Sequence, residues 1–378
     1  ALITDVLDAD QEVMPEDALL LDVATEAMAG LNRRYGPAPG GANRFLLLHR
    51  RRVFVAGEGK WMGWERKRGK LHELNRLLRG ATDTTFMEVA GTIQVPRDVR
   101  YVITLDGDTR LPRDAALKLI GKMAHPLNRP KFGVAEQRVV DGYAILQPRV
   151  TPSLPVGREG SLYQRVFSGP GGIDPYAAAV SDVYQDLFGE GSYTGKGIYE
   201  IDAFEAALAG RVPDGAMLSH DLFEGIFARA GLATDVEVVE DFPPRYDVAA
   251  RRQHRWIRGD WQLLPWIFGV PGRRMPGVGR WKMVDNLLRS VASPLSLAAL
   301  ALCWLFPMPA AVTGTLLVLA NLAIPAFLPA VFSMLPRRSD IGFRNHMHSV
   351  ASDLQLAARQ TLLAVAFLAD HAWGAGDG

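Results

Sequence analysis

A long run without charged residues most constrains how this chain can fold. Residues 291–335 include no Asp, Glu, Lys or Arg. At about 20 residues per membrane crossing, the run is long enough for two spans and too long for one. The prolines Pro307 and Pro309 favour a turn between the two halves. We therefore expect a transmembrane helical hairpin within residues 276–336, with spans over 291–306 and 310–335.

The charges beside this run predict its orientation. Cationic residues flank both outer ends, whereas the central turn has none; they are Arg280, Lys282 and Arg289 before the run, and Arg337, Arg338 and Arg344 after it. By the positive-inside tendency, both outer ends face the cytoplasm. Residues 337–378 then form a cytoplasmic or interfacial segment with an amphipathic helix over 353–370. A buried helical hairpin of a soluble protein is the alternative interpretation of the run.

The composition of the whole chain excludes several classes of protein. The chain has 378 residues, with 42 Lys+Arg against 41 Asp+Glu, and this balance argues against a dedicated nucleic-acid binder. A charged fraction of 22%, together with 16 Phe, 8 Trp and 9 Tyr, excludes a mostly disordered chain. The single cysteine, Cys303, excludes an internal disulfide framework and a zinc site built from cysteines.

Residues 1–275 alternate between strand and helix patterns. Apolar runs predict strands over 1–4, 45–48 and 99–105, and helical spacing predicts helices over 15–35, 70–79 and 111–123. In the first helix, Leu19, Leu20 and Val23 belong to the predicted apolar face. This alternation predicts an α/β domain with an open, mainly parallel sheet flanked by helices. Ligands bind beyond the carboxyl ends of such strands, where Asp5, Asp106 and Asp108 are found.

The segment Asp106-Gly107-Asp108 brings two carboxylates into a glycine turn after a predicted strand. Two oxygen ligands at this spacing suit Mg²⁺ or Mn²⁺ held against a diphosphate. A simple Asp-Gly turn is the alternative. A haloacid-dehalogenase-type phosphatase also begins with a strand and two aspartates, but Thr109 stands one place earlier than that pattern requires.

Three further segments have side chains that could perform chemistry. The glycine-rich stretch 189–197 is not a P-loop, because Gly197 follows Lys196 where Ser or Thr is required, and a glycine loop lining a cleft is favoured. Ser219 is a predicted N-cap, which makes Asp221 either a capping charge or a general base. The arginines and tryptophans of 251–261 could bind nucleic acid, line a membrane surface or clamp an anion.

Five longer strings give these separate signals a common interpretation. They are Trp61-Met-Gly-Trp-Glu-Arg-Lys-Arg-Gly-Lys70, Tyr101-Val-Ile-Thr-Leu-Asp-Gly-Asp108-Thr-Arg-Leu-Pro112, Met123-Ala-His-Pro-Leu-Asn-Arg-Pro130, Phe188-Gly-Glu-Gly-Ser-Tyr-Thr-Gly-Lys-Gly-Ile-Tyr199 and Leu218-Ser-His-Asp-Leu-Phe-Glu-Gly225. The order of the separate signals resembles that of processive family 2-like glycosyltransferases, such as cellulose and hyaluronan synthases. The order is an acid after an early strand, Gly69-Lys70 opening a helix, Asp106-x-Asp108, Asp221 at a helix start and Arg255-Trp256 just before the predicted membrane helices. The amino-acid sequences of the five strings resemble still more closely those of the cyclic β-1,2-glucan synthases of Gram-negative bacteria.

The resemblance implies a fold, an activity and partners. Residues 1–275 would be a GT-A-like glycosyltransferase domain that lacks its first strand. The protein would be an inverting transferase of the bacterial inner membrane, with a cytoplasmic catalytic domain that polymerises glucose from UDP-glucose into (cyclic) β-1,2-glucan. Its partners would be UDP-glucose, the glucan acceptor, the lipid bilayer and further domains of a longer chain, including a phosphorylase-like C-terminal region. A β-1,4 or β-1,3 polysaccharide synthase and a non-catalytic membrane binding module are the alternatives. Without its first strand, we expect the isolated chain to fold poorly or be inactive.

The resemblance also implies roles for individual residues. Asp5 resembles the acid that contacts uridine, Lys70 the lysine near the nucleotide, Asp106 and Asp108 the metal and UDP-sugar motif, and Asp221 the base that deprotonates the acceptor hydroxyl. Gln253, Arg255 and Trp256 resemble the Gln-x-x-Arg-Trp motif, in which the arginine holds the donor diphosphate and the other two hold the acceptor. Two positions depart from the family pattern. His220 replaces the acid before the base, and Arg252 occupies the first motif position, with Gln253 one place late.

Overall fold

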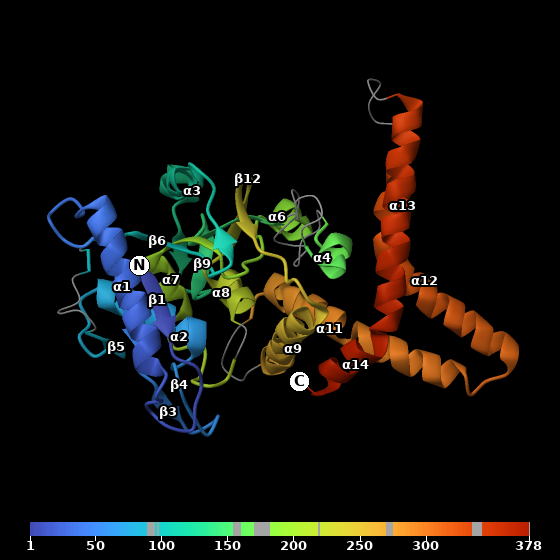
Figure 1. The fold of residues 1–378 in the computed structure, drawn as a ribbon, viewed down its shortest axis with the longest axis horizontal. Coiled ribbons are helices and arrows are strands. Elements are labelled where there is room, and N and C mark those ends of the chain that lie inside the picture. The colour runs from blue at the N-terminus through green and yellow to red at the C-terminus, as the bar shows by residue number, and fades with distance from the viewer. Residues whose placement is uncertain are drawn as a thin grey trace. The chain divides into compact units, whose positions relative to one another are not determined.

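The computed structural model describes residues 1–88, 95–96, 98–153, 160–169, 182–217, 220–269, 275–334 and 342–377. They form a mixed α/β structure followed by long C-terminal helices (Figure 1). The chain divides into two compact units that interleave along the sequence. Unit 1 contains Ala1–Thr104, Ile120–Leu146 and Gly197–Ala230, and unit 2 contains Leu105–Leu119, Gln147–Lys196 and Gly231–Gly378.

A three-stranded sheet in unit 1 has the order β1-β2-β5. β1 (Leu2–Asp5) pairs in parallel with β2 (Leu47–Arg50), and this register sets Asp5 opposite Arg50. β5 (Phe86–Met87) pairs with β2 in the antiparallel sense. Leu48, Leu74 and Phe86 form a buried cluster on this sheet. The short core beneath β1 and β2 therefore fixes the end of β1, where Asp5 lies.

A five-stranded sheet has the order β6-β11-β10-β12-β7. The strands are β6 (Tyr101–Thr104), β7 (Thr109–Arg110), β10 (Ile145–Pro152), β11 (Gly197–Glu200) and β12 (Ala230–Glu240). β11 is antiparallel to β6 and to β10, and β12 is antiparallel to β7. The expected mainly parallel sheet is therefore wrong, since the described sheets are mixed. β12 alternates buried with more exposed positions along its length, which is the pattern of antiparallel strands covered on one face.

The remaining strands form two small hairpins in unit 1. β3 (Val53–Val55) pairs with β4 (Lys60–Met62), and β8 (Lys131–Gly133) pairs with β9 (Arg138–Asp141). The helices before the C-terminal region are α1 (Asp17–Tyr35), α2 (Arg66–Leu78), α3 (Ala115–Ala124), the 3₁₀ turn η1 (Pro126–Asn128), α4 (Leu162–Phe167), α6 (Val183–Phe188), α7 (Ile201–Leu208), α8 (Asp221–Phe227), α9 (Tyr246–Gln262) and α10 (Leu264–Phe268). The predicted helices over 15–35, 70–79 and 111–123 are confirmed as α1, α2 and α3, with ends that differ by a few residues.

Helix α1 ends at Tyr35, at the end of the predicted range, and is followed by Gly36, whose φ of 69° suits glycine. Its buried face differs from the expected one, because Leu19, Leu20 and Val23 are all more than half exposed. Asn32 instead makes two 2.9 Å hydrogen bonds to the backbone of Phe45, one as donor and one as acceptor. Polar contacts on the opposite side of the helix therefore set its rotation and leave the leucines outward.

Two C-terminal helices, α11 (Gly277–Cys303) and α12 (Met308–Ser333), are long and apolar enough to cross a membrane. Figure 1 shows them as consecutive rods joined by a short turn, which falls at the predicted Pro307. Only 6% of each apolar window is buried, so the buried-hairpin alternative is not favoured.

Arg337 and Arg338 lie outside the described residues. The expected amphipathic helix over 353–370 covers the end of α13 (Phe343–Ala366) and the start of α14 (Leu368–Asp377).

Candidate functional site

The two aspartates after β6 lie in a tight turn of unit 2. The amide of Thr109 donates to the carbonyl of Asp106 at 3.0 Å, and this bond closes the turn between β6 and β7. The amide of Asp241, which follows β12, donates to the carbonyl of Asp108 at 3.0 Å. The side chains of Asp106 and Asp108 are 31% and 38% exposed, so both carboxylates are accessible to a ligand.

Three further charged residues of unit 2 surround this turn. The ammonium Nζ of Lys196 lies 3.0 Å from Oδ2 of Asp106 and 3.3 Å from Oε2 of Glu240. The guanidinium of Arg252 pairs with the same Glu240 and lies 3.5 Å from Oδ2 of Asp108. Lys196 and Glu240 are nearly buried, with 7% of each side chain exposed. We call Asp106, Asp108, Lys196, Glu240 and Arg252 the acid–cation cluster.

The elements that bring in these three residues come from distant parts of the chain. Lys196 lies in the loop before β11 between Gly195 and Gly197, whose φ angles of 78° and 139° favour glycine. Glu240 is the last residue of β12, and Arg252 lies within α9. The glycine-rich stretch therefore serves to place Lys196 against the turn.

The residue types of this cluster fit a divalent cation. Asp106 and Asp108 offer the hard oxygen ligands that Mg²⁺ and Mn²⁺ prefer. Three carboxylates and two cationic side chains give the cluster a formal charge of −1, which favours a cation. Lys196 and Arg252 are cations that can also donate hydrogen bonds to a phosphate.

Helix α9 carries the predicted Gln-x-x-Arg-Trp residues. The guanidinium of Arg252 lies 5.0 Å from the ring centroid of Trp256, four residues later on the same helix face. Gln253, Arg255 and Trp256 have exposed side chains. Arg252, at the first position of the motif, is therefore a residue that α9 presents to Asp108 and Glu240.

The predicted nucleotide residues Asp5 and Lys70 lie together in unit 1. The Nζ of Lys70 is 3.0 Å from Oδ2 of Asp5, and Nε of Arg50 donates to Oδ1 of Asp5 at 2.7 Å. Arg50 is fully buried and also donates to Glu73 at 3.0 Å. Gly63 adjoins the pair, because a Cβ built there would lie 2.8 Å from Cγ of Asp5. The structure brings Asp5 and Lys70 into one ion-pair group.

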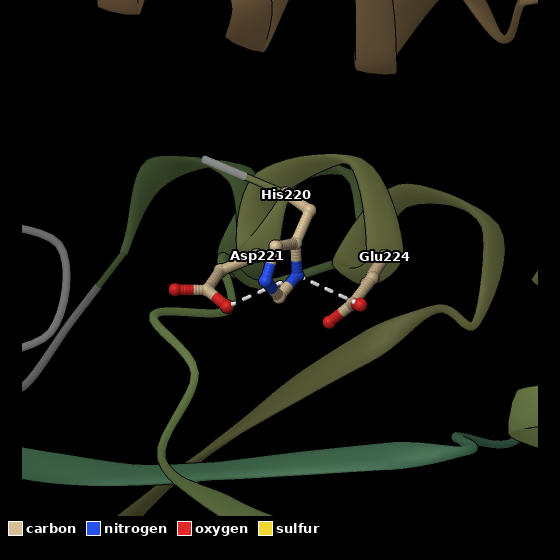
Figure 2. A group of neighbouring side chains, drawn as sticks. All are labelled: His220, Asp221 and Glu224. Atoms are coloured by element: carbon tan, nitrogen blue, oxygen red, sulfur yellow. Dashed lines mark ion pairs between the residues drawn. The ribbon is translucent and has the colours of Figure 1, made fainter. Parts of the chain in front are cut away.

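Asp221 begins helix α8 in unit 1, and His220 is its N-cap residue, while the expected N-cap Ser219 lies outside the described residues. Figure 2 shows the imidazole of His220 between the carboxylates of Asp221 and Glu224. Its Nδ1 is 2.8 Å from Oε1 of Glu224 and 3.5 Å from Oδ1 of Asp221. Glu224 is 2% exposed, whereas 28% of the Asp221 side chain is exposed.

The His220–Glu224 contact changes the charge state of the imidazole. Burial alone lowers the pKa of His220, but the Glu224 carboxylate, aided by Asp221, outweighs it and the pKa is raised. These three side chains have the types and spacing of a metal site. The raised pKa favours a proton on His220, and the 2.8 Å contact of its Nδ1 places that charge against the Glu224 carboxylate. We therefore assign His220 and Glu224 as a buried ion pair behind Asp221.

Sequence patterns alone did not identify several of these contacts. Arg50, Glu73 and Glu240 were not predicted as site residues, and Lys196 and Arg252 were noted only as parts of motifs. The basic run at 49–52 directly after a strand, and the acids that end β12, are the signals that could have indicated Arg50 and Glu240. All five are buried or half-buried charges, which need partners that only the folded chain reveals.

A comparison with known proteins shows what this chain is similar to. No protein-family model matches the chain. The chain is 52% identical over 374 residues to cyclic beta-(1,2)-glucan synthase NdvB of Rhizobium meliloti (strain 1021). The match covers 98% of the chain and 13% of that relative. The chain is therefore homologous to one part of a cyclic beta-(1,2)-glucan synthase, and the family that its motifs predicted is confirmed.

Proposed function

We propose that this chain carries the glucosyl-transfer site of a membrane-bound cyclic glucan synthase. The donor is UDP-glucose and the product is a β-1,2-linked glucan, made with inversion at the anomeric carbon. The acid–cation cluster carries the proposal, since it combines two metal-ligating carboxylates with two cations that can bind a diphosphate. The name of the R. meliloti relative supports the choice of glucan as product.

The transfer is one in-line displacement. The acceptor hydroxyl oxygen forms a bond to C1 of glucose, the bond between C1 and the diphosphate oxygen breaks, and UDP departs. The hydroxyl proton passes to Asp221, whose half-buried carboxylate begins α8. No nucleophilic side chain takes part, because inversion needs a single step.

The departing diphosphate needs positive charge around it. Asp106 and Asp108 would hold Mg²⁺ or Mn²⁺, which would neutralise the charge that grows on the leaving group. Lys196, Arg252 and the exposed Arg255 supply further cationic donors from the protein itself. In this proposal the carboxylates of the cluster bind the metal, and its cationic side chains bind the diphosphate.

The remaining predicted residues bind the two substrates. Asp5 and Lys70 are proposed to hold the nucleotide, with Arg50 fixing the position of Asp5. Gln253 and Trp256 on α9 are proposed to hold the end of the acceptor, because an indole offers an apolar face to a sugar ring. In this proposal residues 1–275 form a GT-A-type domain.

Helices α11 and α12 are proposed to cross the bacterial inner membrane, with the transfer site on the cytoplasmic side. Their length and exposed apolar surfaces support this assignment. The chain spans 13% of the relative's length, so the full-length protein is proposed to contain further domains, including a phosphorylase-like region.

The proposed base can be tested in the full-length protein. Asp221→Asn should lower glucose incorporation from labelled UDP-glucose by at least about 100-fold, since loss of general base catalysis costs 10²–10⁴ in rate. UDP binding should persist, because Asp221 is assigned to the acceptor. Asp202→Asn, at an exposed ion pair with Arg79, is the matched control and should keep full activity. Undiminished incorporation by Asp221→Asn would remove Asp221 from this role.

A further inference from the structure

The two aspartates of the acid–cation cluster already have cationic partners in the chain itself. Lys196 contacts Asp106 at 3.0 Å, and Arg252 lies 3.5 Å from Asp108. We propose that Lys196 and Arg252 are built-in counter-cations that hold Asp106 and Asp108 until a metal–diphosphate complex displaces them, and that Glu240 retains both cations afterwards. This inference rests on the metal role proposed above for the two aspartates.

Glu240 is placed to make such an exchange possible. A buried cation that loses its only carboxylate is strongly destabilised. Lys196 is 7% exposed, but its Nζ also lies 3.3 Å from Oε2 of Glu240. Arg252 pairs with the other oxygen, Oε1 of Glu240. Each cation can therefore leave its aspartate and stay paired with Glu240.

The geometry also favours a new partner for the released cations. Trp256 supports the guanidinium of Arg252 at 5.0 Å, so this side chain keeps its position on α9 without Asp108. The flanking glycines fix the backbone at Lys196. Two positioned cations beside a metal site suit a doubly charged diphosphate.

A coupling between ligands follows from this arrangement. Metal alone must compete with Lys196 and Arg252, so it binds weakly. A nucleoside diphosphate gives the displaced cations a second anionic partner and so raises the affinity for metal. By linkage, metal raises the affinity for the nucleotide by the same factor. The site would thus load metal and donor together.

The test measures Mn²⁺ binding to the full-length protein in detergent by electron paramagnetic resonance, with and without UDP. The signal that is lost in the Asp106→Ala/Asp108→Ala double variant defines binding at this site. Lys196→Met should tighten Mn²⁺ binding without UDP by about fivefold or more, and fivefold is the lower end of measured couplings between two ligands. The same variant should reduce the increase in Mn²⁺ affinity that UDP causes. Lys196→Arg, which keeps the cation, should restore the weak binding.

Glu240→Gln should have the opposite effect. Within the part of the chain that the structure describes, Asp106 and Asp108 are the carboxylates that would remain to Lys196 and Arg252 without the Glu240 charge, and Mn²⁺ binding without UDP should weaken. Arg110→Met is the matched control, because Arg110 is two residues from Asp108 but pairs at the surface with Asp241. It should leave Mn²⁺ binding unchanged.

The outcomes separate this inference from the proposed function. Unchanged or weaker Mn²⁺ binding by Lys196→Met, or equal tightening by Arg110→Met, overturns the counter-cation role while the metal site stands. A wild-type protein that binds no Mn²⁺ at this site even with UDP overturns the proposed metal role, and the inference with it.

Discussion

Arg50 shows how one buried cation organises the residues around Asp5. Its guanidinium donates to Asp5, to Glu73 and to the carbonyls of Trp64 and Arg66, at distances from 2.7 to 3.0 Å. These acceptors satisfy the side chain from several directions, which a fully buried arginine requires. The position of Asp5 therefore depends on a contact between residues 45 positions apart in the sequence.

A methyl group at Gly63 should disturb this arrangement. The Cβ of Gly63→Ala would lie 2.8 Å from Cγ of Asp5 and 2.9 Å from Nη2 of Arg50. Because both side chains are locked in ion pairs, the overlap should cost about 1–3 kcal/mol in the free energy of unfolding. UDP affinity should also fall, which calorimetry would measure. Gly121→Ala, where a Cβ meets no atom within 4 Å in helix α3, should not destabilise the protein. Equal melting temperatures for the two variants would contradict this account of Asp5.

Single residues could be predicted where a motif and a strand end coincide. Asp5 and Lys70 were each predicted to bind the nucleotide, and the structure brings them within 3.0 Å of one another, although binding itself stays a prediction. The partners of Arg50 could not be predicted, because they depend on the parallel register of β1 with β2. Lys196 likewise gains its role only when the loop before β11 reaches Asp106.

At the scale of single elements, helix α8 makes stability depend on pH. His220 is buried among Glu224, Asp221 and the more distant Lys67, and its pKa is raised in the folded state. The folded state thus binds the proton more tightly than the unfolded state does. The resulting stabilisation is fully present below the unfolded pKa of about 6.5 and is lost as pH rises through the folded pKa.

The comparison of wild type with His220→Gln isolates this effect. At about pH 6 the variant should be less stable by about 3–5 kcal/mol, because it leaves Glu224 buried without its partner. The difference in melting temperature should then shrink as pH rises, whereas a difference independent of pH would argue against a charged His220. His49, whose pKa is lowered by burial, is common to both proteins and cancels in the comparison.

The elements themselves were predicted better than their partners. Helical spacing located α1 and α2, because this signal is local. The predicted parallel direction of the strands was wrong, because the β-α alternation near the N-terminus was extended to the region of β10 and β12. There β10 is antiparallel to β11, and β12 is antiparallel to β7. Pro148 and Pro152 within β10 also obscure its strand pattern. For α1, polar contacts of Asn32 overrode the apolar face formed by its leucines.

In the whole molecule, the charged residues of the proposed site and the uncharged run occupy separate parts of the sequence. The uncharged run forms most of two long helices with exposed apolar surfaces, and the charged residues of the proposed site all precede it. This division was predictable, because the hydropathy of a long segment does not depend on tertiary contacts. The linkage of the product is different, since it follows from how the acceptor is held and no motif encodes it.

Linkage analysis of the product tests whether this protein forms β-1,2 glucan at the site that contains Asp221. Membranes containing the full-length protein would be supplied with labelled UDP-glucose, and the labelled polymer would be analysed for its glycosidic bonds. We expect glucose joined through β-1,2 bonds, with the labelled polymer absent when Asp221→Asn replaces the wild type. A β-1,3 or β-1,4 product, or a labelled polymer that persists in Asp221→Asn, would contradict this expectation.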